Sequence, residues 1–304
     1  MADSAAEDLS QWTKVIVPQR GLFEIPWREL WNYRDLIRQL VIRDFTATYK
    51  QTLLGPLWFV IQPVLTTVAF SFLFGRMGRL GTDNLPHFVF YLAGLTPWTY
   101  FAECVSRTSH TFTRNAQVFG KVYFPRLAVP ISTLIANLVG FGVRLTILVL
   151  GILFYLWQDG RLVDAALTAH TAIPRLSGID PNWRIALLPL LVLDMAMLAM
   201  GVGCIVSALT TRFRDLSVGI GFAVQLWMFA SCIIFPLSRI ELGDRWVFLL
   251  NPMVPVIEGF RFAFLGEGVV EKWHLAMSFG ISSLMLLIGV VLFNRASQNV
   301  MDTV

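Results

Sequence analysis

Six apolar intervals, separated by polar stretches, run along the chain. Most are close to the roughly 20 residues that a helix needs to cross about 30 Å of hydrocarbon. The intervals are 54–74, 88–105, 127–157, 185–209, 218–236 and 275–293. We therefore expect an all-α membrane protein with six transmembrane helices. The third interval is longer than one crossing requires, so its helix must tilt, kink or protrude.

A cationic helical pattern at residues 27–53 precedes the first interval. Its apolar positions recur at spacings of three, four and seven, which places them on one helical face. They are Trp27, Leu30, Trp31, Ile37, Val41, Phe45 and Thr48, and the other side carries Arg28, Arg34, Arg38, Arg43 and Lys50. The pattern is typical of an amphipathic helix in the membrane interface. The alternative, a surface helix of a soluble domain, fits less well because a span follows at once.

The stretch between the fifth and sixth intervals is mixed. It holds two short apolar pieces, 246–250 and 253–265, broken by Asn251-Pro252 and containing Glu258 and Arg261. Neither piece is long enough to span. We expect a re-entrant helical hairpin over residues 240–265, which is allowed where protein covers the backbone or the backbone lines a cavity.

Six crossings place both termini on one side of the membrane. Lysine and arginine are denser in the N-terminal tail, the 106–126 segment and the 210–217 turn than in the opposite loops. The positive-inside rule therefore predicts that both termini are cytoplasmic. Residues 1–26 form a polar tail without the usual signal-peptide pattern, and residues 158–184 are expected to form an external loop.

The composition supports a membrane protein. The chain is 56% hydrophobic and 14% charged, whereas soluble domains have about 25% charged residues. The net charge of +4 is explained by cations that flank spans, and no basic and aromatic array predicts nucleic-acid binding. Cys104, Cys204 and Cys232 lack metal-ligand spacing and are expected to be buried.

The sequence lacks a phosphate-binding loop. Its one Gly-Lys pair, Gly120-Lys121, lacks the upstream glycine and the following Ser or Thr. If the protein uses ATP, another chain must bind it. We expect no cofactor or metal in this chain and no catalytic residue.

A short amphipathic pattern extends over residues 114–126. Its apolar residues are Val118, Phe119 and Val122, and Pro125 ends it. Such a helix in a cytosolic loop can dock in a groove on a soluble partner. A helix that lies on the bilayer fits the composition equally well.

Arg144 and Asp194 are the charges deep in the predicted spans. Intramembrane charges indicate function by default, but we favour a structural pairing of Arg144 with Asp194 or with a backbone carbonyl. Small residues at 199, 203 and 207 predict close helix packing, within the subunit or between subunits. Some of the many aromatic residues could line a path for sugar rings.

Several motifs occur in order along the chain. They are Arg43-Asp44 with residues 49–58 (YKQTLLGPLW), Gln62-Pro63, residues 121–126 (KVYFPR), residues 212–215 (RFRD), and Asn251-Pro252 followed by Phe260-Arg261. Together they resemble the permease subunits of bacterial ABC type-2 polysaccharide exporters, from about residue 27 to the end.

The resemblance implies a channel-forming homodimer of six-span subunits with two copies of a separate soluble ABC ATPase, which would hold ATP and Mg. Its substrate would be a lipid-linked glycan such as O-antigen, capsule or teichoic acid, exported across the inner membrane. The 114–126 helix would be the coupling helix, the helix from Trp27 the gate helix, and the 240–265 hairpin the external gate.

Two sets of candidate residues follow from this resemblance. The ATPase-coupling residues would be Arg114, Asn115, Val118, Phe119, Lys121, Val122, Tyr123, Phe124 and Arg126. The gate residues, which would meet the substrate headgroup and its pyrophosphate, would be Arg34, Arg38, Arg43, Tyr49 and Lys50. A drug or small-lipid exporter, a secondary transporter and a membrane-embedded transferase remain as alternatives, although no clustered polar catalytic residues favour the last.

Overall fold

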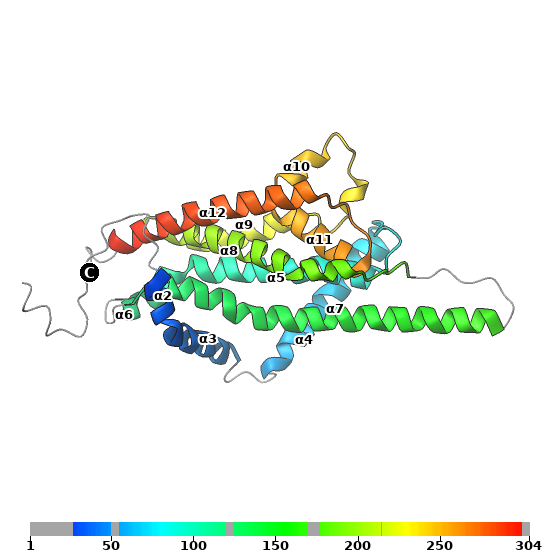
Figure 1. Cartoon of the computed structure of the whole chain (residues 1–304), viewed down its shortest axis with the longest axis horizontal. Coiled ribbons are helices and arrows are strands. Elements are labelled where there is room, and N and C mark those ends of the chain that lie inside the picture. The colour runs from blue at the N-terminus through cyan, green and yellow to red at the C-terminus, as the bar shows by residue number, and fades with distance from the viewer. Residues whose placement is uncertain (1–26, 50–54, 120–123, 169–176, 214, 300–304) are drawn as a thin grey trace, which may run out of the picture.

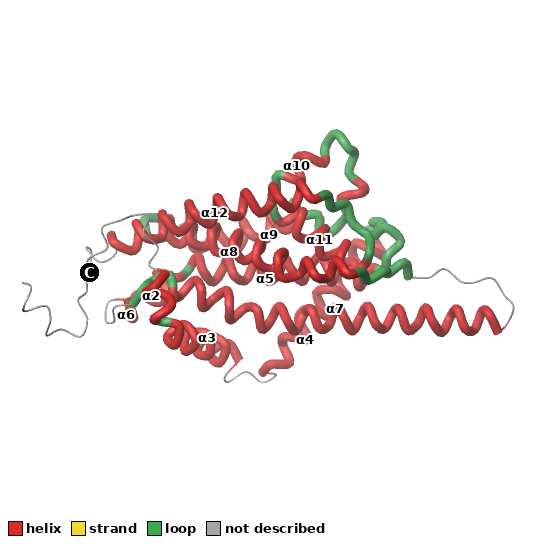
Figure 2. The backbone as a smooth tube through the Cα atoms, in the orientation of Figure 1, coloured by secondary structure: helices red, strands yellow, loops and turns green. Residues whose placement is uncertain are grey.

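The computed structural model describes residues 27–49, 55–119, 124–168, 177–213 and 215–299. Helices dominate these residues and no strand occurs among them, which confirms the all-α class. The longest helices run along the long axis of the molecule (Figures 1 and 2). The helix bounds are α2 Trp27–Asn32, α3 Arg34–Tyr49, η1 Gly55–Leu57, α4 Trp58–Phe70, η2 Ser71–Met77, α5 His87–Ser109, α6 Thr111–Phe119, α7 Ala128–Thr168, η3 Trp183–Leu187, α8 Leu188–Thr210, α9 Leu216–Phe229, η4 Leu237–Arg239, α10 Arg245–Leu249, α11 Met253–Leu265 and α12 Lys272–Asn299.

Four helical stretches in the described residues are long and apolar enough to cross a membrane. They are 58–77, 128–163, 183–210 and 272–298, so the multi-span character of the chain is confirmed. The second predicted span corresponds to α5, which has 23 residues. The fifth corresponds to α9, which has 14 residues and ends at Phe229 instead of Pro236. The six-span topology therefore stays a prediction.

Helix α5 is the centre of the bundle. It contacts α4, α7, α8, α9 and α11, and its first half is buried on all sides, including Tyr91 and Trp98. An apolar helical stretch is normally buried in this way. In the second half, one face is only half-buried and carries Thr99, Glu103 and Arg107. The elements around α5 therefore decide which of its side chains stay accessible.

Small residues set how closely α8 approaches its neighbours. A Cβ atom added to Gly201 would collide with the backbone of α12 at Met285, and one added to Gly203 would collide with Thr108 of α5. Small residues allow such close packing between membrane helices. Gly203 belongs to the small-residue repeat predicted from the sequence, and its other members, Ala199 and Ser207, are also fully buried, so the repeat packs within this chain.

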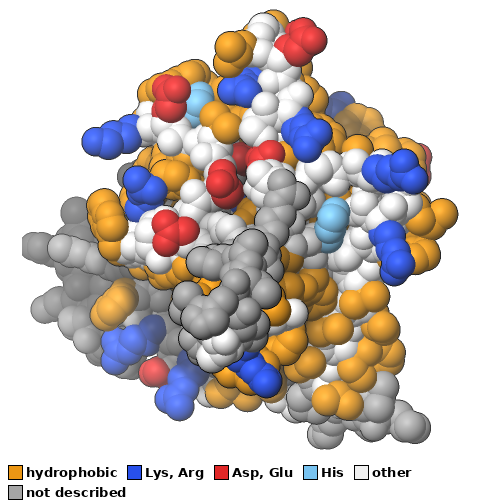
Figure 3. All heavy atoms as spheres, turned by 90° about the vertical axis from the view of Figure 1, so that its right-hand side faces the viewer, with side chains coloured by type: hydrophobic (Ala, Val, Ile, Leu, Met, Phe, Trp, Pro, Cys, Tyr) orange, Lys and Arg blue, Asp and Glu red, His pale blue; other side chains and the backbone are white. Residues whose placement is uncertain are grey.

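Helix α7 is much longer than predicted. Its 41 residues extend over about 60 Å at 1.5 Å per residue, and its end projects past the other helices (Figure 1). Residues 158–168, expected in an external loop, continue the helix instead. Most of them are ordinary helix formers, and nothing there interrupts the helix. The end view in Figure 3 shows charged side chains of both signs near this end of the molecule.

The predicted hairpin consists of α10 and α11, which are joined at Asn251-Pro252 as expected. Asn251 holds this corner, since its Oδ1 accepts a hydrogen bond from Trp227 Nε1 at 3.0 Å and its Nδ2 donates to the Ala230 carbonyl at 3.0 Å. Helix α11 ends at Gly266, whose φ of 82° is the left-handed conformation that favours glycine at a helix end. Whether the hairpin re-enters the membrane stays a prediction.

The predicted amphipathic helix corresponds to α2 and α3. Leu30 and Leu40 are buried against the chain itself, in a cluster with Phe112 and Phe293. By contrast, Trp31, which was predicted on the same apolar face as Leu30, is 71% exposed. Some apolar residues of these helices therefore pack against the rest of the chain, while others are exposed. A position of the helices in the membrane interface stays a prediction.

Candidate functional site

Three adjoining cavities follow one side of α5. Their volumes are about 380, 270 and 360 Å³. Arg107 lines both the first and the second cavity, while Gln62, Pro63 and Arg144 line both the second and the third. Because neighbouring cavities share lining residues, we describe them together as the groove. Its α5 residues run from Leu92 to Arg107, about 22 Å along the helix.

Helical periodicity explains why these residues line one groove. On α5, α4 and α7 they recur at spacings of three and four, which keeps them on one face. The α5 residues are Leu92, Leu95, Thr96, Trp98, Thr99, Ala102, Glu103 and Arg107. The α4 residues are Trp58, Phe59, Gln62, Pro63, Thr66, Thr67 and Phe70. The α7 residues are Val129, Thr133, Ala136, Asn137, Gly140 and Arg144, and α9 adds Gly221, Val224, Gln225 and Met228.

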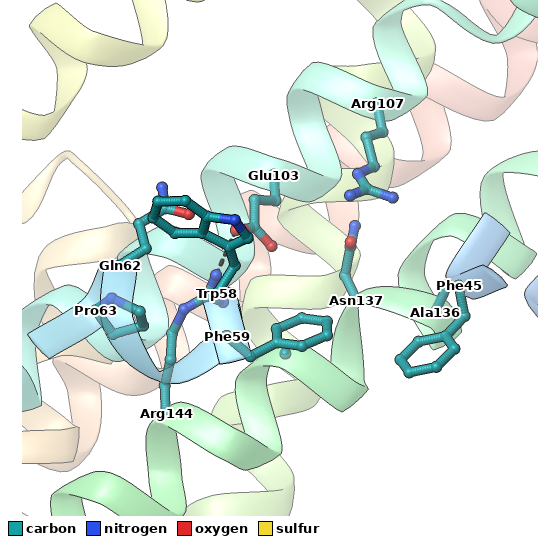
Figure 4. Close-up of a pocket in the computed structure, with 11 residues that line it drawn as sticks. Phe45, Trp58, Phe59, Gln62, Pro63, Glu103, Arg107, Ala136, Asn137 and Arg144 are labelled. Atoms are coloured by element: carbon teal, nitrogen blue, oxygen red, sulfur yellow. Dashed lines mark hydrogen bonds and ion pairs between the residues drawn. The ribbon is translucent and has the colours of Figure 1, made fainter. Parts of the chain in front are cut away.

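Aromatic rings occupy the middle of the groove. Trp58 is 44% exposed, and Phe59 stacks on Phe45 of α3 with ring centroids 6.1 Å apart. Figure 4 shows these rings around the polar side chains of α5 and α7. The arrangement combines apolar surfaces with polar groups, as ligand sites usually do.

Polar side chains along the groove have unused hydrogen-bonding capacity. Gln62, Thr66 and Gln225 are exposed, and none of them has a side-chain hydrogen bond within the described residues. The Thr67 hydroxyl is buried and also lacks a partner there. Such groups bind water or a ligand, because an unpaired polar group is costly away from water.

An ion pair crosses the groove between α5 and α7. Arg144 Nη2 bonds Glu103 Oε1 (Figure 4), with side-chain exposures of 7% for Arg144 and 31% for Glu103. Arg144 Nη1 is buried and has no partner in the described part of the chain. The predicted pairing of Arg144 with Asp194 is therefore wrong. Glu103 was overlooked because it lies at the end of its predicted span.

Asp194 belongs to another part of the molecule. It is 2% exposed, and its Oδ2 lies 2.6 Å from Ser278 Oγ of α12, which also lies 2.8 Å from the Pro252 carbonyl. Asp194 therefore joins α8 to α12 beneath the start of α11. Asp194 therefore has a structural role, as expected, but its partner is Ser278 and not Arg144.

The first cavity forms the end of the groove between α3, α6 and α7. Arg43, Asp44, Arg107 and Arg114 line it, and Arg43 Nη2 pairs with Asp44 Oδ1 at 2.8 Å. Of the predicted gate residues whose side chains the structure describes, only Arg43 lines the groove. Arg34 and Arg38 are exposed elsewhere on α3, the side chain of Tyr49 is not described, and Lys50 lies outside the described residues.

The predicted coupling helix corresponds to α6, which begins at Thr111 and ends at Phe119. One face packs inward: Asn115 is 8% exposed and Phe119 contacts Phe112 and Phe124. The other face is exposed at Thr113, Arg114, Ala116 and Gln117. The side chain of Val118 is not described, and Lys121, Val122 and Tyr123 lie outside the described residues.

The ends of this segment are fixed to the rest of the chain. Phe124 is 6% exposed, and the Arg126 guanidinium donates to the Ser297 carbonyl of α12. Burial lowers the pKa of His110, which joins α5 to α6, and the nearby Arg114 guanidinium lowers it further. His110 is therefore neutral near pH 7. Phe119, Phe124 and Arg126 thus serve packing within the chain, and the exposed face of α6 is what a partner could contact.

A second arginine–glutamate pair lies in α11, far along the sequence from the groove pair. Arg261 and Glu258 are each 1% exposed. Arg261 donates to Glu258 at 2.9 Å and to the carbonyls of Cys232 and Ile233 at 2.8 Å each. Glu258 accepts from two backbone N–H groups, those of Leu237 and Val269. We call this pair and its partners the hub.

The hub connects two segments to the centre of the bundle, the one that follows α9 and the one that precedes α12. The Arg261 guanidinium lies 3.8 Å from the ring centroid of Phe90 on α5, which allows a cation–π contact. The sequence contained one signal for this pair, because Glu258 and Arg261 are three residues apart in an apolar helix. Within the described ranges, no group of three His, Cys, Asp or Glu side chains could hold a metal ion.

Comparison with known proteins gives a consistent result. Residues 35–265 match the family described as ABC-2 type transporter. The O-antigen export system permease protein RfbA of Myxococcus xanthus is 27% identical over 280 residues, which cover 91% of this chain and 98% of that protein.

Two further relatives have similar coverage. RfbA of Klebsiella pneumoniae is 26% identical over 261 residues, 86% of this chain and 92% of that protein. The polysialic acid transport protein KpsM of Escherichia coli is 24% identical over 267 residues, 86% of this chain and 93% of that protein. The similarity to each relative thus extends over most of both chains.

Proposed function

The chain belongs to the ABC-2 type transporter family, and we propose that it is the channel-forming permease of an ATP-driven exporter. Its cargo would be a lipid-linked polysaccharide, moved across the cytoplasmic membrane. The relatives named for O-antigen export and polysialic acid transport support this class of cargo. The groove is the observation that carries the proposal, because its free amides, hydroxyls and aromatic rings suit sugar hydroxyls and ring faces.

A second copy of the chain would close the groove into a channel. Gln62, Thr66 and Gln225 are exposed on apolar helices, and in a single chain they would face lipid. Polar groups at membrane depth normally face the protein interior or a water-filled cavity. A homodimer with the grooves facing each other would satisfy them.

The exposed face of α6 would receive the ATPase. The chain has no phosphate-binding loop, so ATP and Mg would be bound by two copies of a partner subunit. His110 alone separates α5 from α6, so a displacement of α6 is transmitted directly to the helix that lines the groove. This short connection would couple ATP-driven movement of the partner to opening of the path.

Docking can be tested by co-purification with the ABC ATPase encoded beside this chain. Arg114→Glu reverses an exposed charge on α6, and Arg161→Glu reverses an exposed charge at the far end of α7. We expect Arg114→Glu to reduce recovery of the ATPase several-fold, since rim charges control association, whereas Arg161→Glu should behave as wild type. Equal recovery of the ATPase with both variants would contradict docking at α6.

The export path can be tested in proteoliposomes that contain the complex and a fluorescent lipid-linked glycan. Trp58→Ala removes an aromatic ring from the groove, while Trp157→Ala removes an exposed ring from outside it. We expect only Trp58→Ala to slow ATP-dependent export, with the complex intact. Export without the ATPase, or transport of small lipids but no glycan, would overturn the proposed function.

A further inference from the structure

The groove holds more positive than negative charge. Arg43, Arg107, Arg114 and Arg144 line it, against Asp44 and Glu103. Arg43 is paired with Asp44, and Glu103 is paired with Arg144. Arg107 lies where the first two cavities meet, and it has no hydrogen bond or ion pair within the described residues. This cation is therefore available to a ligand.

Arg144 contributes the second available donor. Its residue is 6% exposed, yet Nη1 has no partner among the described residues, because Glu103 holds only Nη2. A Cβ atom added to Gly140 would lie 3.6 Å from Nη1 and 2.9 Å from the Phe59 ring, so the glycine allows Phe59 to lie close to this part of the groove. A buried guanidinium nitrogen without a partner is costly, and an acceptor on a ligand would remove this cost.

The geometry brings the two arginines to the same cavity. Glu103 and Arg107 are four residues apart on α5 and therefore face the same side. Figure 4 shows both side chains pointing from α5 toward α7, with Asn137 below Arg107 and Arg144 beneath Glu103. The amides of Asn137 and Gln62 and the ring of Trp58 surround this position.

We propose that Arg107 and Arg144 form a subsite for an anionic group, a carboxylate or a phosphate, carried by the transported chain. Guanidinium groups suit both anions because their donors match the oxygen geometry. The low-dielectric walls of a groove strengthen this attraction. The inference rests on the proposed function for the identity of the cargo, but it assigns a charge preference to the groove. An acidic sugar would present the anion within the glycan, and a polyprenyl pyrophosphate would present it on the carrier.

Binding to the full-length chain in nanodiscs, with and without the ATPase, tests the subsite. The probes are a labelled short oligogalacturonate, a neutral maltooligosaccharide of matched length, and a short-chain polyprenyl pyrophosphate. We expect Arg107→Gln to weaken binding of an anionic probe about tenfold, the usual effect of losing a hydrogen bond to a charged group. Binding of the maltooligosaccharide should change much less.

Two further variants serve as controls, one expected to tighten binding and one expected to leave it unchanged. Glu103→Gln removes the competing carboxylate and should tighten binding of the anionic probe, whereas Arg161→Gln removes an exposed cation outside the groove and should match wild type. Added salt should weaken binding of the anionic probes and leave binding of the maltooligosaccharide nearly unchanged. Because Arg107 has no hydrogen bond or ion pair with any described residue, Arg107→Gln should fold normally even if Arg144→Gln does not.

The outcomes separate the possible sources of the anion. Weaker binding of oligogalacturonate in Arg107→Gln places the anion on the sugars, and weaker binding of the pyrophosphate alone places it on the carrier. Unchanged binding of both anionic probes in Arg107→Gln would overturn the subsite. Failure of the wild-type chain to assemble with the ATPase would count against the proposed function and leaves the binding comparison intact.

Discussion

The groove pair and the hub pair consist of the same two residue types, yet their surroundings differ. In the hub, Arg261 and Glu258 are both 1% exposed, and each also binds backbone groups of neighbouring segments. In the groove, Glu103 is 31% exposed, and one nitrogen of Arg144 has no partner among the residues that the structure describes. The hub uses its charges to hold segments together, whereas the groove keeps part of its charge available.

This difference indicates how charge can serve two purposes in an apolar bundle. A buried ion pair is tolerated only when further hydrogen bonds satisfy it. Each pair leaves one arginine nitrogen without a partner among the described residues, Arg261 Nε in the hub and Arg144 Nη1 in the groove. The hub nevertheless meets the condition, because four further hydrogen bonds to backbone groups surround its ion pair. The groove pair does not meet it, as expected of a site that exchanges its contacts with a ligand. The comparison can be tested by changing each region in a matched way.

Breaking the hub should have the largest effect on stability. Glu258→Ala leaves the Arg261 guanidinium buried without a counter-charge and two backbone N–H groups without acceptors. Loss of one partner of a buried pair costs about 3–5 kcal/mol. Thermal unfolding of the detergent-solubilised chain should show a clearly lower midpoint. Glu103→Ala is the matched control and should lower the midpoint far less, and equal shifts would contradict the comparison.

A glycine beside each arginine offers a subtler test. A Cβ atom at Gly94 would lie 3.0 Å from Arg261 Nη2 and 3.4 Å from the Ile233 side chain. Since the Arg261 guanidinium is held by several partners, Gly94→Ala should cost about 1–3 kcal/mol, as overpacking of a core does.

The corresponding change in the groove is Gly140→Ala. Its Cβ atom would lie 2.9 Å from the Phe59 ring, but this ring is only half-buried and can move aside. We expect a stability change within about 0.5 kcal/mol, with slower export because the groove narrows. Similar unfolding midpoints for the two alanine variants would show that the hub is not more rigid than the groove.

The groove pair itself should contribute least to stability. A double-mutant cycle with Glu103→Gln and Arg144→Gln should give a coupling of about 1 kcal/mol or less, because Glu103 is partly solvated. The same cycle at Glu258 and Arg261 should give a clearly larger value. A groove coupling that equals the hub coupling would mean that Arg144 serves structure and not the cargo.

Part of the candidate site was predictable from the sequence. Arg114 lies on the exposed face of α6 and Arg43 lines the end of the groove, while their coupling and gate roles stay predictions. The inward positions of Phe119 and Phe124 were not predicted, because the same amphipathic pattern can pack against its own chain or against a partner. The choice depends on Phe112 and Phe293, whose rings stack at 4.6 Å between centroids, and on Phe119, which contacts Phe112.

The sequence by itself determined the helical class, the positions of four apolar helices long enough to cross a membrane, the Asn251-Pro252 corner and the family. These properties depend on hydrophobicity and periodicity, which act over neighbouring residues. Only the tertiary structure decided that Arg144 pairs with Glu103, that Arg107 has no ion pair within the described part of the chain, and that Arg261 holds the hub. Those contacts depend on how each helix is rotated about its axis, and this rotation is fixed by the packing of α5 against all its neighbours at once.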